Sequence, residues 1–340
     1  MEISAKILTP DDAVLSRNID DYPEGIIIPI DKPYRWTSAD VIRKVKFAAI
    51  RHFGKKNLKV GHAGTLDPLA TGVLLVCIGK ATKLAEWLQS HHKEYVAGVT
   101  FGATTPSYDL EKEIDRFFPY EHITAGSVEA ALPAFIGEQD QIAPLFSAKS
   151  VDGVRAYELA RKLYKTMERS DSDDPRLSDD RHPLAGGGMS SPSPSYHSSD
   201  NLTDIDEAAK DLIRVSRINI TELEMMEFTD ASEGRGMQNR ATPLAAGGGA
   251  RSEGVGGVVL HTTPSDASSR INVTDNSALG LPRAVIRMAC SKGTYVRAFA
   301  RDLGEALGSG AHLDSLQRSR SGIFSVENAL TVEQAISLLR

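Results

Sequence analysis

The first regular pattern along the chain is an apolar run that gives way to a helical period. Residues 25–30 read Gly-Ile-Ile-Ile-Pro-Ile, which is typical of a buried strand, and Asp31-Lys32-Pro33 ends the run. Thr37 or Ser38 can then cap a helix. The apolar residues on one face of that helix are Val41, Ile42, Val45 and Ala49. The pattern predicts a strand followed by an amphipathic helix.

Further strands and helices follow without a steady strand–helix–strand rhythm. We expect strands at 73–76, 93–101, 213–225 and 284–289. We expect helices at 81–88, 128–136, 155–163 and 295–307, and a capping box, Thr331 to Gln334, before a short last helix. This irregular mixture indicates an α+β fold.

Two segments show neither the 3.6-residue period of an amphipathic helix nor the two-residue period of a strand. Residues 168–211 contain Asp/Ser clusters and a Ser-Pro run, and residues 229–281 contain two glycine clusters. Neither has enough large apolar residues to offset the entropy lost on ordering. We interpret both as disordered surface insertions in one catalytic domain that spans 1–340, with no separate domain after the last helix.

The composition, with 41% apolar and 25% charged residues, is that of a soluble globular protein. Cys77 and Cys290 are too few for a disulfide framework, and no His/Cys spacing suggests a metal site, so we expect a reducing, cytoplasmic setting. The N-terminus is charged where a signal peptide would be apolar, and the aliphatic run Val73–Ile78 is too short to cross a bilayer.

The net charge of −6 argues at first against a nucleic-acid partner. The acidic residues are concentrated, however: 168–211 carries a net −7 and 229–281 a net −1, which leaves +2 on the rest of the chain. That rest includes the basic run 51–59 and the pair Arg318 and Arg320, either of which could equally be a solvated face. Charge alone therefore decides little.

The most informative motif is Gly61–Gly72, with the sequence GHAGTLDPLATG. Its glycines allow close approach or positive φ, and Pro68 restrains Asp67 to an extended conformation. One carboxylate thus lies on a stiff loop ahead of an apolar strand, which is how catalytic side chains are commonly presented. The alternative is a turn in which Asp67 only accepts hydrogen bonds from backbone amides.

Other catalytic motifs do not fit. Gly79-Lys80-Ala81-Thr82 resembles the end of a phosphate-binding loop, but it lacks the earlier glycine and the Ser/Thr after the lysine. There is no nucleophile elbow and no zinc-type histidine spacing. We therefore expect chemistry that needs neither a metal nor a nucleotide cofactor.

Two more motifs carry chemistry-bearing side chains. Lys93-Glu94-Tyr95 opens a strand with an aromatic residue on which a base could stack, and Ser291–Arg297 turns a strand into a helix. An arginine near a buried carboxylate would keep it ionised, as a nucleophile requires. The alternatives are core packing for Tyr95 and Tyr295 and a weak surface ion pair for Arg297.

Taken together, these motifs resemble the TruB family of tRNA pseudouridine synthases. The resemblance covers about 24–165, 212–228 and 283–339. Besides the motifs above, it rests on Asp31-Lys32-Pro33, Thr37-Ser38, the segments 142–153 and 155–161, and Gly310-Ala311-His312-Leu313. It implies the pseudouridine-synthase fold, a mixed, mainly antiparallel sheet flanked by helices.

The resemblance also implies roles. Asp67 matches the family's nucleophile, Arg297 its ion-pair partner, and Tyr95 the tyrosine that stacks on the target base. The other matches are Tyr295, which shapes the same pocket, His62, which fills the space of the displaced base, Lys32, a supporting lysine, and Leu316, a pocket leucine. The implied reaction isomerises a flipped uridine at position 55, in the T loop of tRNA, without a cofactor. The expected partner is the tRNA T stem-loop, with no membrane and no obligatory protein partner.

Some features depart from the family pattern. The two insertions are extra, and Thr104–Asp109 matches the family's Thr- and Asp-rich loop only in part, so Asp109 is a weaker candidate. The small C-terminal RNA-binding domain of some members has no counterpart. Two alternatives stay open: a non-catalytic tRNA-binding or tRNA-folding protein on the same scaffold, and a guide-dependent synthase acting on other RNAs.

Overall fold

The computed structural model describes residues 3–144, 150–151, 154–155, 215–231 and 271–340. The chain divides into two compact units, Met1–Gln141 with Arg217–Arg340, and Ile142–Ser216. In the second unit, β9 (Ser150–Val151) and β10 (Val154–Arg155) pair antiparallel. The helix expected at 155–163 lies outside the described residues, apart from Arg155 at the end of β10.

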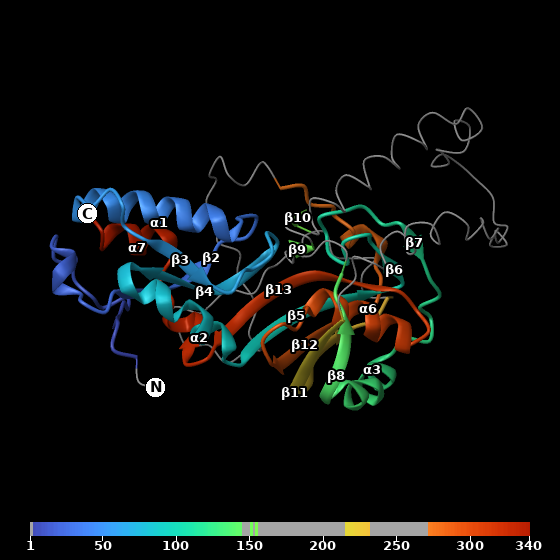
Figure 1. The fold of residues 1–340 in the computed structure, drawn as a ribbon. Helices are drawn as coiled ribbons and strands as arrows, with labels where there is room; N and C mark the ends of the chain where they lie inside the picture. Colours follow the sequence, from blue (N-terminus) through green and yellow to red (C-terminus); the bar gives the residue numbers. More distant parts are fainter. Residues whose placement is uncertain (1–2, 145–149, 152–153, 156–214, 232–270) are drawn as a thin grey trace, which may run out of the picture. The chain divides into compact units, whose positions relative to one another are not determined.

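A mixed sheet organises this unit (Figure 1). Among the described residues its order is β1-β2-β4-β13-β5-β12-β11-β8, with β3 on β4 and β14 on β13. The pairs β1–β2 and β4–β13 are parallel, whereas β2–β4, β3–β4, β5–β13, β5–β12 and β11–β12 are antiparallel. The strands are β1 (Lys6–Ile7), β2 (Ile26–Lys32), β3 (Val60–Ala63), β4 (Ala70–Ile78), β5 (Lys93–Phe101), β8 (Gly137–Ile142), β11 (Val215–Thr229), β12 (Arg283–Cys290), β13 (Ala311–Ser321) and β14 (Phe324–Ser325). The α+β fold with a mainly antiparallel sheet is confirmed.

Strand β4 is buried on both faces along its whole length. Leu74, Val76 and Ile78 belong to the hydrophobic cluster on one side of the sheet. Val73 and Leu75 belong to the cluster on the other side, which includes residues of α2 (Ala85–Ser90). Because both faces are covered, the strand reads as a continuous apolar run instead of an alternating one.

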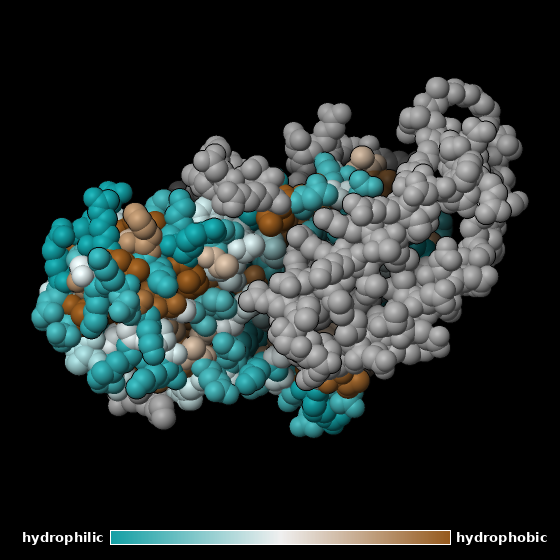
Figure 2. All heavy atoms as spheres, turned by 45° about the horizontal axis from the view of Figure 1, so that its top comes forward, coloured by the Kyte–Doolittle hydropathy of each residue, from teal (hydrophilic) through white to brown (hydrophobic). Residues whose placement is uncertain are grey.

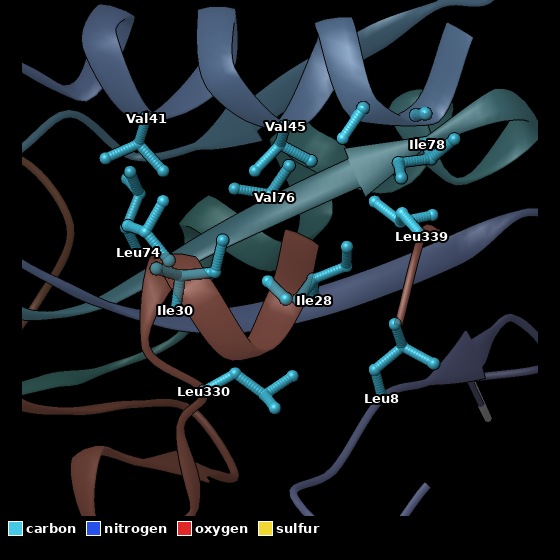
Figure 3. Packing of buried hydrophobic residues seen from close by; sticks show 14 of the residues in the cluster. Leu8, Ile28, Ile30, Val41, Val45, Leu74, Val76, Ile78, Leu330 and Leu339 are labelled. Atoms are coloured by element: carbon cyan, nitrogen blue, oxygen red, sulfur yellow. The ribbon is translucent and has the colours of Figure 1, made fainter. Parts of the chain in front are cut away.

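Helix α1 (Ser38–Phe53) covers one face of β2 and β4 (Figure 3). The Thr37 side chain accepts a hydrogen bond from the Asp40 amide, and the Asp40 carboxylate accepts one from the Thr37 amide, so the expected cap is a capping box. Val41 and Val45 point from the helix toward Leu74 and Val76, while α7 (Val332–Ser337) packs beside them. A left-handed residue, Gly54 at φ 62°, ends α1.

A second cluster fills the space between the other half of the sheet and helices α3 (Ala125–Ala131) and α6 (Val296–Ala306). Tyr95 on β5 and Leu316 on β13 pack against both this cluster and the one under α1. These two side chains therefore mark the junction between the cores. No helix in the described part of the chain is long and apolar enough to cross a membrane.

Several elements differ from the sequence prediction. The helix expected at 128–136 is α3 followed by a 3-10 turn, η3 (Leu132–Phe135), because Pro133 cannot donate the amide hydrogen bond of a continuing α-helix. The helix expected at 81–88 begins as the 3-10 segment η2 (Gly79–Leu84). Strand β13 was missed because its sequence is mostly polar, although it lies at the centre of the sheet.

The end of the second predicted insertion contacts the folded unit. The Thr274 amide donates to the Leu110 carbonyl at 2.8 Å, and Arg35 Nη2 donates to the Ile271 carbonyl at 2.7 Å. A 3-10 turn, η6 (Ser277–Leu279), then leads to the buried Gly280 and into β12. Residues 271–281 are thus packed against this unit. The first insertion and residues 232–270 lie outside the described part.

Gly72 allows β4 to approach β13 closely. Its φ is +95°, and a Cβ there would lie 2.2 Å from the Arg318 carbonyl oxygen. Gly72→Ala should lower the free energy of unfolding by about 2 to 4 kcal/mol, because backbone would have to move at the centre of the sheet. Urea denaturation measures this. Gly61→Ala is the control, since a Cβ there meets nothing within 4 Å. Equal midpoints for the two variants would contradict the close-approach constraint.

Candidate active site

The motif 61–72 forms the end of β3, a loop and the start of β4. The loop is tied to the first turn of α1, because Ser38 Oγ donates to the Leu66 carbonyl at 3.1 Å and accepts from the Leu66 amide at 2.9 Å. The Ala70 amide donates to the Asp67 carbonyl at 3.1 Å. Asp67 therefore lies on a fixed loop just before an apolar strand, as the sequence predicted.

Arg297, in the first turn of α6, pairs with Asp67 across 230 residues of sequence. Its Nε donates to Asp67 Oδ2 at 2.9 Å, and its Nη1 donates to the Ser107 carbonyl at 3.0 Å. The Arg297 side chain is 6% exposed and that of Asp67 is 38% exposed. The predicted pairing is confirmed, and the reading of Arg297 as a surface ion pair is wrong. Burial opposes its charge, yet the two carboxylates Asp67 and Asp109 hold the pKa of Arg297 above its ordinary value.

Asp109 is the second carboxylate on this guanidinium, with its Oδ2 3.7 Å from Arg297 Nε. Its Oδ1 accepts hydrogen bonds from Ser107 Oγ at 2.6 Å and from the Glu111 amide at 3.0 Å. Burial raises the pKa of Asp109 above its ordinary value, against the opposing effect of Arg297. Because Asp109 is buried and committed to these donors, Asp67 is the carboxylate that remains accessible.

A pocket opens beside the ion pair, at the junction of the two cores. Its lining includes Asp67, Asp109 and Arg297. The remaining wall residues are mostly apolar, namely Leu69, Ala70, Leu110, Leu313, Asp314, Ser315 and Leu316. Leu316 is thus where the resemblance implied. A pocket that combines mostly apolar walls with a few charged groups is typical of a small-molecule site.

Lys32 lies fully buried beneath the motif loop. Its Nζ donates to the carbonyls of Pro33 at 3.0 Å, Trp36 at 2.6 Å and Pro68 at 3.2 Å. Burial lowers the pKa of Lys32 to about 7, although Asp67 and Asp31 act in the opposite direction. Through the carbonyl of Pro68, this lysine fixes the backbone next to Asp67.

Arg318 is the main residue that sequence reasoning missed, because its neighbour Arg320 suggested a solvated basic face. Its side chain is buried, and it donates to the carbonyls of Val73 at 2.7 Å, Gly64 at 3.1 Å and Thr65 at 3.5 Å. The charged guanidinium therefore supports the motif loop from the central strand. The only hint in the sequence is the position of Arg318 two residues after Leu316, on the same face of a strand.

Tyr95 lies opposite Arg318 in the register of β5 and β13. Burial raises the pKa of Tyr95, while Arg318 opposes this through charge and a hydrogen bond. Asp67 acts in the same direction as burial, as the smallest contribution to that shift. Tyr95 is therefore a neutral, half-buried ring near Asp67 at ordinary pH.

His62 and Tyr295 lie outside the set of residues that line the pocket. His62 is on β3, and its buried Nδ1 has no hydrogen-bond partner among the described residues. Burial, and then Arg318, lower the pKa of His62. Tyr295 is the N-cap of α6, and Gln141 bonds both its amide, at 2.8 Å, and its carbonyl, at 3.1 Å. The backbone of Tyr295 thus anchors the N-terminus of α6, the helix that carries Arg297.

Two non-glycine residues in the described part have positive φ, Arg35 at 62° and Tyr108 at 54°. Tyr108 lies between Ser107 and Asp109, which both contact Arg297. Arg35 follows Tyr34, whose pKa is raised by burial and also responds to Asp109. Backbone strain of this kind collects at functional sites. No sequence signal marked either residue.

Comparisons with known proteins agree with this geometry. The family model of the TruB family pseudouridylate synthase (N terminal domain) matches residues 51–173, and that of the tRNA pseudouridylate synthase B C-terminal domain matches residues 297–338. The chain is 39% identical to the tRNA pseudouridine synthase B of Phocaeicola vulgatus over 92% of each chain. It is 34% identical to the protein of that name from Thermus thermophilus, over 89% of this chain and 75% of the relative.

Solved structures show a more distant likeness. A chain of a Cbf5-Nop10-Gar1 complex matches with a TM-score of 0.46 at 18% identity, over 99% of this chain and 72% of that one. A chain of an H/ACA RNP bound to a substrate RNA containing 2′-deoxyuridine matches with a TM-score of 0.46 at 18% identity, over 98% of this chain. Our chain spans 59% of that second chain, which is less than two thirds of its length.

The pKa of Lys32 makes stability depend on pH. Native Lys32 releases its proton near pH 7, whereas in the unfolded chain it keeps the proton up to its ordinary pKa of 10.5. The unfolded state therefore binds more protons between these values, and stability rises with pH across the window. Lys32→Met removes this contribution. From pH 7 to 9.5, unfolding free energies should rise by about 3 kcal/mol more in the parent than in Lys32→Met. Equal slopes in urea denaturation would show that Lys32 stays charged.

Proposed function

Because the chain belongs to the TruB family of pseudouridylate synthases, we propose that it converts uridine at position 55, in the T loop of tRNA, to pseudouridine with Asp67 as the nucleophile. The observation that carries this proposal is the accessible Asp67 carboxylate, paired with the buried Arg297 in the lining of a mostly apolar pocket. The relatives named above are tRNA pseudouridine synthases. By similarity to them, we propose tRNA as the substrate of this chain.

The reaction requires one carboxylate and a pocket for the base, and it consumes no second substrate. The bond from the ribose to the base nitrogen breaks, the base turns, and a bond from the ribose to a ring carbon forms. That carbon loses a proton, the released nitrogen gains one, and no electrons are exchanged with another molecule. Attack on the ribose and attack on the base ring both fit the position of Asp67, and both need its ionised form. Arg297 holds the carboxylate in place through the 2.9 Å contact.

The target base has to leave its stack to reach Asp67. In this proposal, Leu316 forms part of the apolar wall against which the flipped ring lies. Tyr95 stacks on that ring, and His62 fills the space that it leaves in the RNA. Tyr295 shapes the same pocket. Lys32 acts as a positioning residue, since its contact to the Pro68 carbonyl supports the loop of Asp67.

We also propose that this chain works alone. Its core segments (24–165, 212–228 and 283–339) would form one catalytic domain, and 168–211 and 229–281 would be insertions. The T stem-loop of tRNA would be the recognised partner, with no protein partner required, in the cytoplasm. The contacts of residues 271–281 with Arg35 and Leu110 make that end the least dispensable part of either insertion.

Asp67→Asn tests the nucleophile. The amide keeps the size of the side chain but loses its charge and nucleophilicity, so pseudouridine formation should fall below detection while tRNA binding persists. A carbodiimide assay on unmodified tRNA measures the product, and filter binding measures affinity. Ser107→Ala serves as a control for disturbance near the site. Turnover by Asp67→Asn, after deamidation has been excluded by mass spectrometry, would overturn the assignment.

Arg297→Lys tests the ion pair. A lysine cannot span Asp67 and the Ser107 carbonyl together, as the guanidinium does. We expect single turnover to slow by about 100-fold or more, with a far smaller change in tRNA affinity. The matched control is Arg301→Lys on the same helix, because Arg301 pairs with Asp302 and lies over the Tyr108 ring. Equal rates for the two variants would refute a specific role for Arg297.

A further inference from the structure

The outer side of α1 and the turn that follows it carry a dense set of cations. We call this set the basic face; it comprises Lys44, Lys46, Arg51, Lys55, Lys56 and Lys59, all exposed. Arg43 is excluded because it pairs with Asp40, which is the only acidic residue of α1. We propose that the basic face binds the phosphate backbone of tRNA outside the T loop.

None of the six cations has an ion-pair partner among the residues that the structure describes. Lys44 lies over the Trp36 ring, with its Nζ 5.7 Å from the ring centroid, so it is held by an aromatic face and not by an acid. Elsewhere exposed lysines do find acids, as Lys6 does with Asp12 and Lys80 with Glu24. The positive charges of the basic face are therefore not neutralised by acidic side chains nearby in the described part of the chain.

This contrast matters because the whole chain carries a net charge of −6. A protein of that charge repels a polyanion at long range, so productive binding needs a local concentration of positive charge. Six unpaired cations within sixteen positions, from Lys44 to Lys59, provide one. In the other half of the sheet, Arg217 and Arg287 are instead paired with glutamates or aspartates.

The segment that carries the basic face is connected to the candidate site at both ends. At its start, Ser38 in the first turn of α1 is hydrogen-bonded to Leu66, the residue before Asp67. At its end, Lys59 leads directly into β3, which carries His62 toward the same loop. A helix of 16 residues is about 24 Å long. The cations thus extend from the site over a distance comparable to several base pairs of a stem.

An aromatic side chain lies among these cations. Phe47 is 70% exposed, and α1 occupies the left part of the view in Figure 2, where hydrophilic side chains dominate the surface. Protein interfaces are depleted of lysine at their centres, so a single exposed ring within a lysine-rich face favours a nucleic acid over a protein partner. The inferred ligand is therefore the sugar-phosphate backbone of the stem that adjoins the T loop.

The test reverses three charges of the basic face together: Lys46→Glu, Arg51→Glu and Lys55→Glu. The matched control is Lys6→Glu, Lys80→Glu and Lys83→Glu, which changes the net charge equally. Lys80 and Lys83 lie on η2, whose Ala81 and Leu84 pack in the cluster on the opposite side of the sheet. Circular dichroism and thermal melting verify that both triple variants are folded. Affinity for full-length unmodified tRNA is measured by filter binding from 50 to 300 mM salt.

We expect the basic-face variant to bind tRNA at least about tenfold more weakly. The slope of log affinity against log salt concentration should fall in magnitude by about two to three, because each lost phosphate contact releases nearly one counterion fewer on binding. The control should keep the parental slope. Single turnover at saturating tRNA should match the parent in the control variant. Equal losses of tRNA affinity in the two variants would overturn the proposal, since the change in the protein's net charge would explain them. An unchanged slope in the basic-face variant would also overturn it and assign the face to a partner of another class.

This inference rests on the proposed function, but the two can fail separately. If the parent binds tRNA and forms no pseudouridine, the proposed chemistry fails while the salt slopes still test the basic face. If the parent forms pseudouridine and the slopes do not change, only the basic face is refuted.

Discussion

A guanidinium buried in a protein core has to be paired, and in this molecule that requirement assembles the site. Arg297 draws its contacts from Asp67, 230 residues away, and from the Ser107 carbonyl, 190 residues away. Asp109 adds a second carboxylate at 3.7 Å. A buried guanidinium that lost these partners would be costly. The loop after β3, the loop before Asp109 and the start of α6 are therefore held at one point.

The central strand β13 supplies the second constraint. Arg318 extends from it to the carbonyls of Gly64, Thr65 and Val73, and so supports the motif loop. Gly72 lets β4 pass close to the Arg318 backbone, and Lys32 supports Pro68 from below. The loop of Asp67 is thus held by Lys32 and Arg318 through backbone carbonyls, while its own carboxylate is paired with Arg297 and partly accessible. In the proposed function, such preorganisation holds the nucleophile ready for a flipped base.

Much of this arrangement could be predicted from the sequence, because the informative features are local. The strand-then-helix pattern at 25–49, the capping boxes and the Gly-rich loop each depend on residues within a few positions of one another. The pairing of Arg297 with Asp67 was predicted from chemical need and family resemblance. The roles of Arg318 and Lys32 as ligands of backbone carbonyls could not be predicted, since nothing in the sequence shows which carbonyls a folded chain leaves unpaired. Strand β13 was missed for a related reason: its polar residues Gln317 and Arg318 are buried by partners that only the tertiary structure provides.

The central claim is that Asp67 and its cations form a site for one uridine of tRNA. Its most direct test is to map pseudouridine at single-nucleotide resolution in unmodified tRNA after incubation with the pure protein. The account predicts near-complete conversion of one T-loop uridine, at position 55, with no added cofactor or protein. Conversion at other positions, or no conversion by folded protein that binds the tRNA, would contradict it.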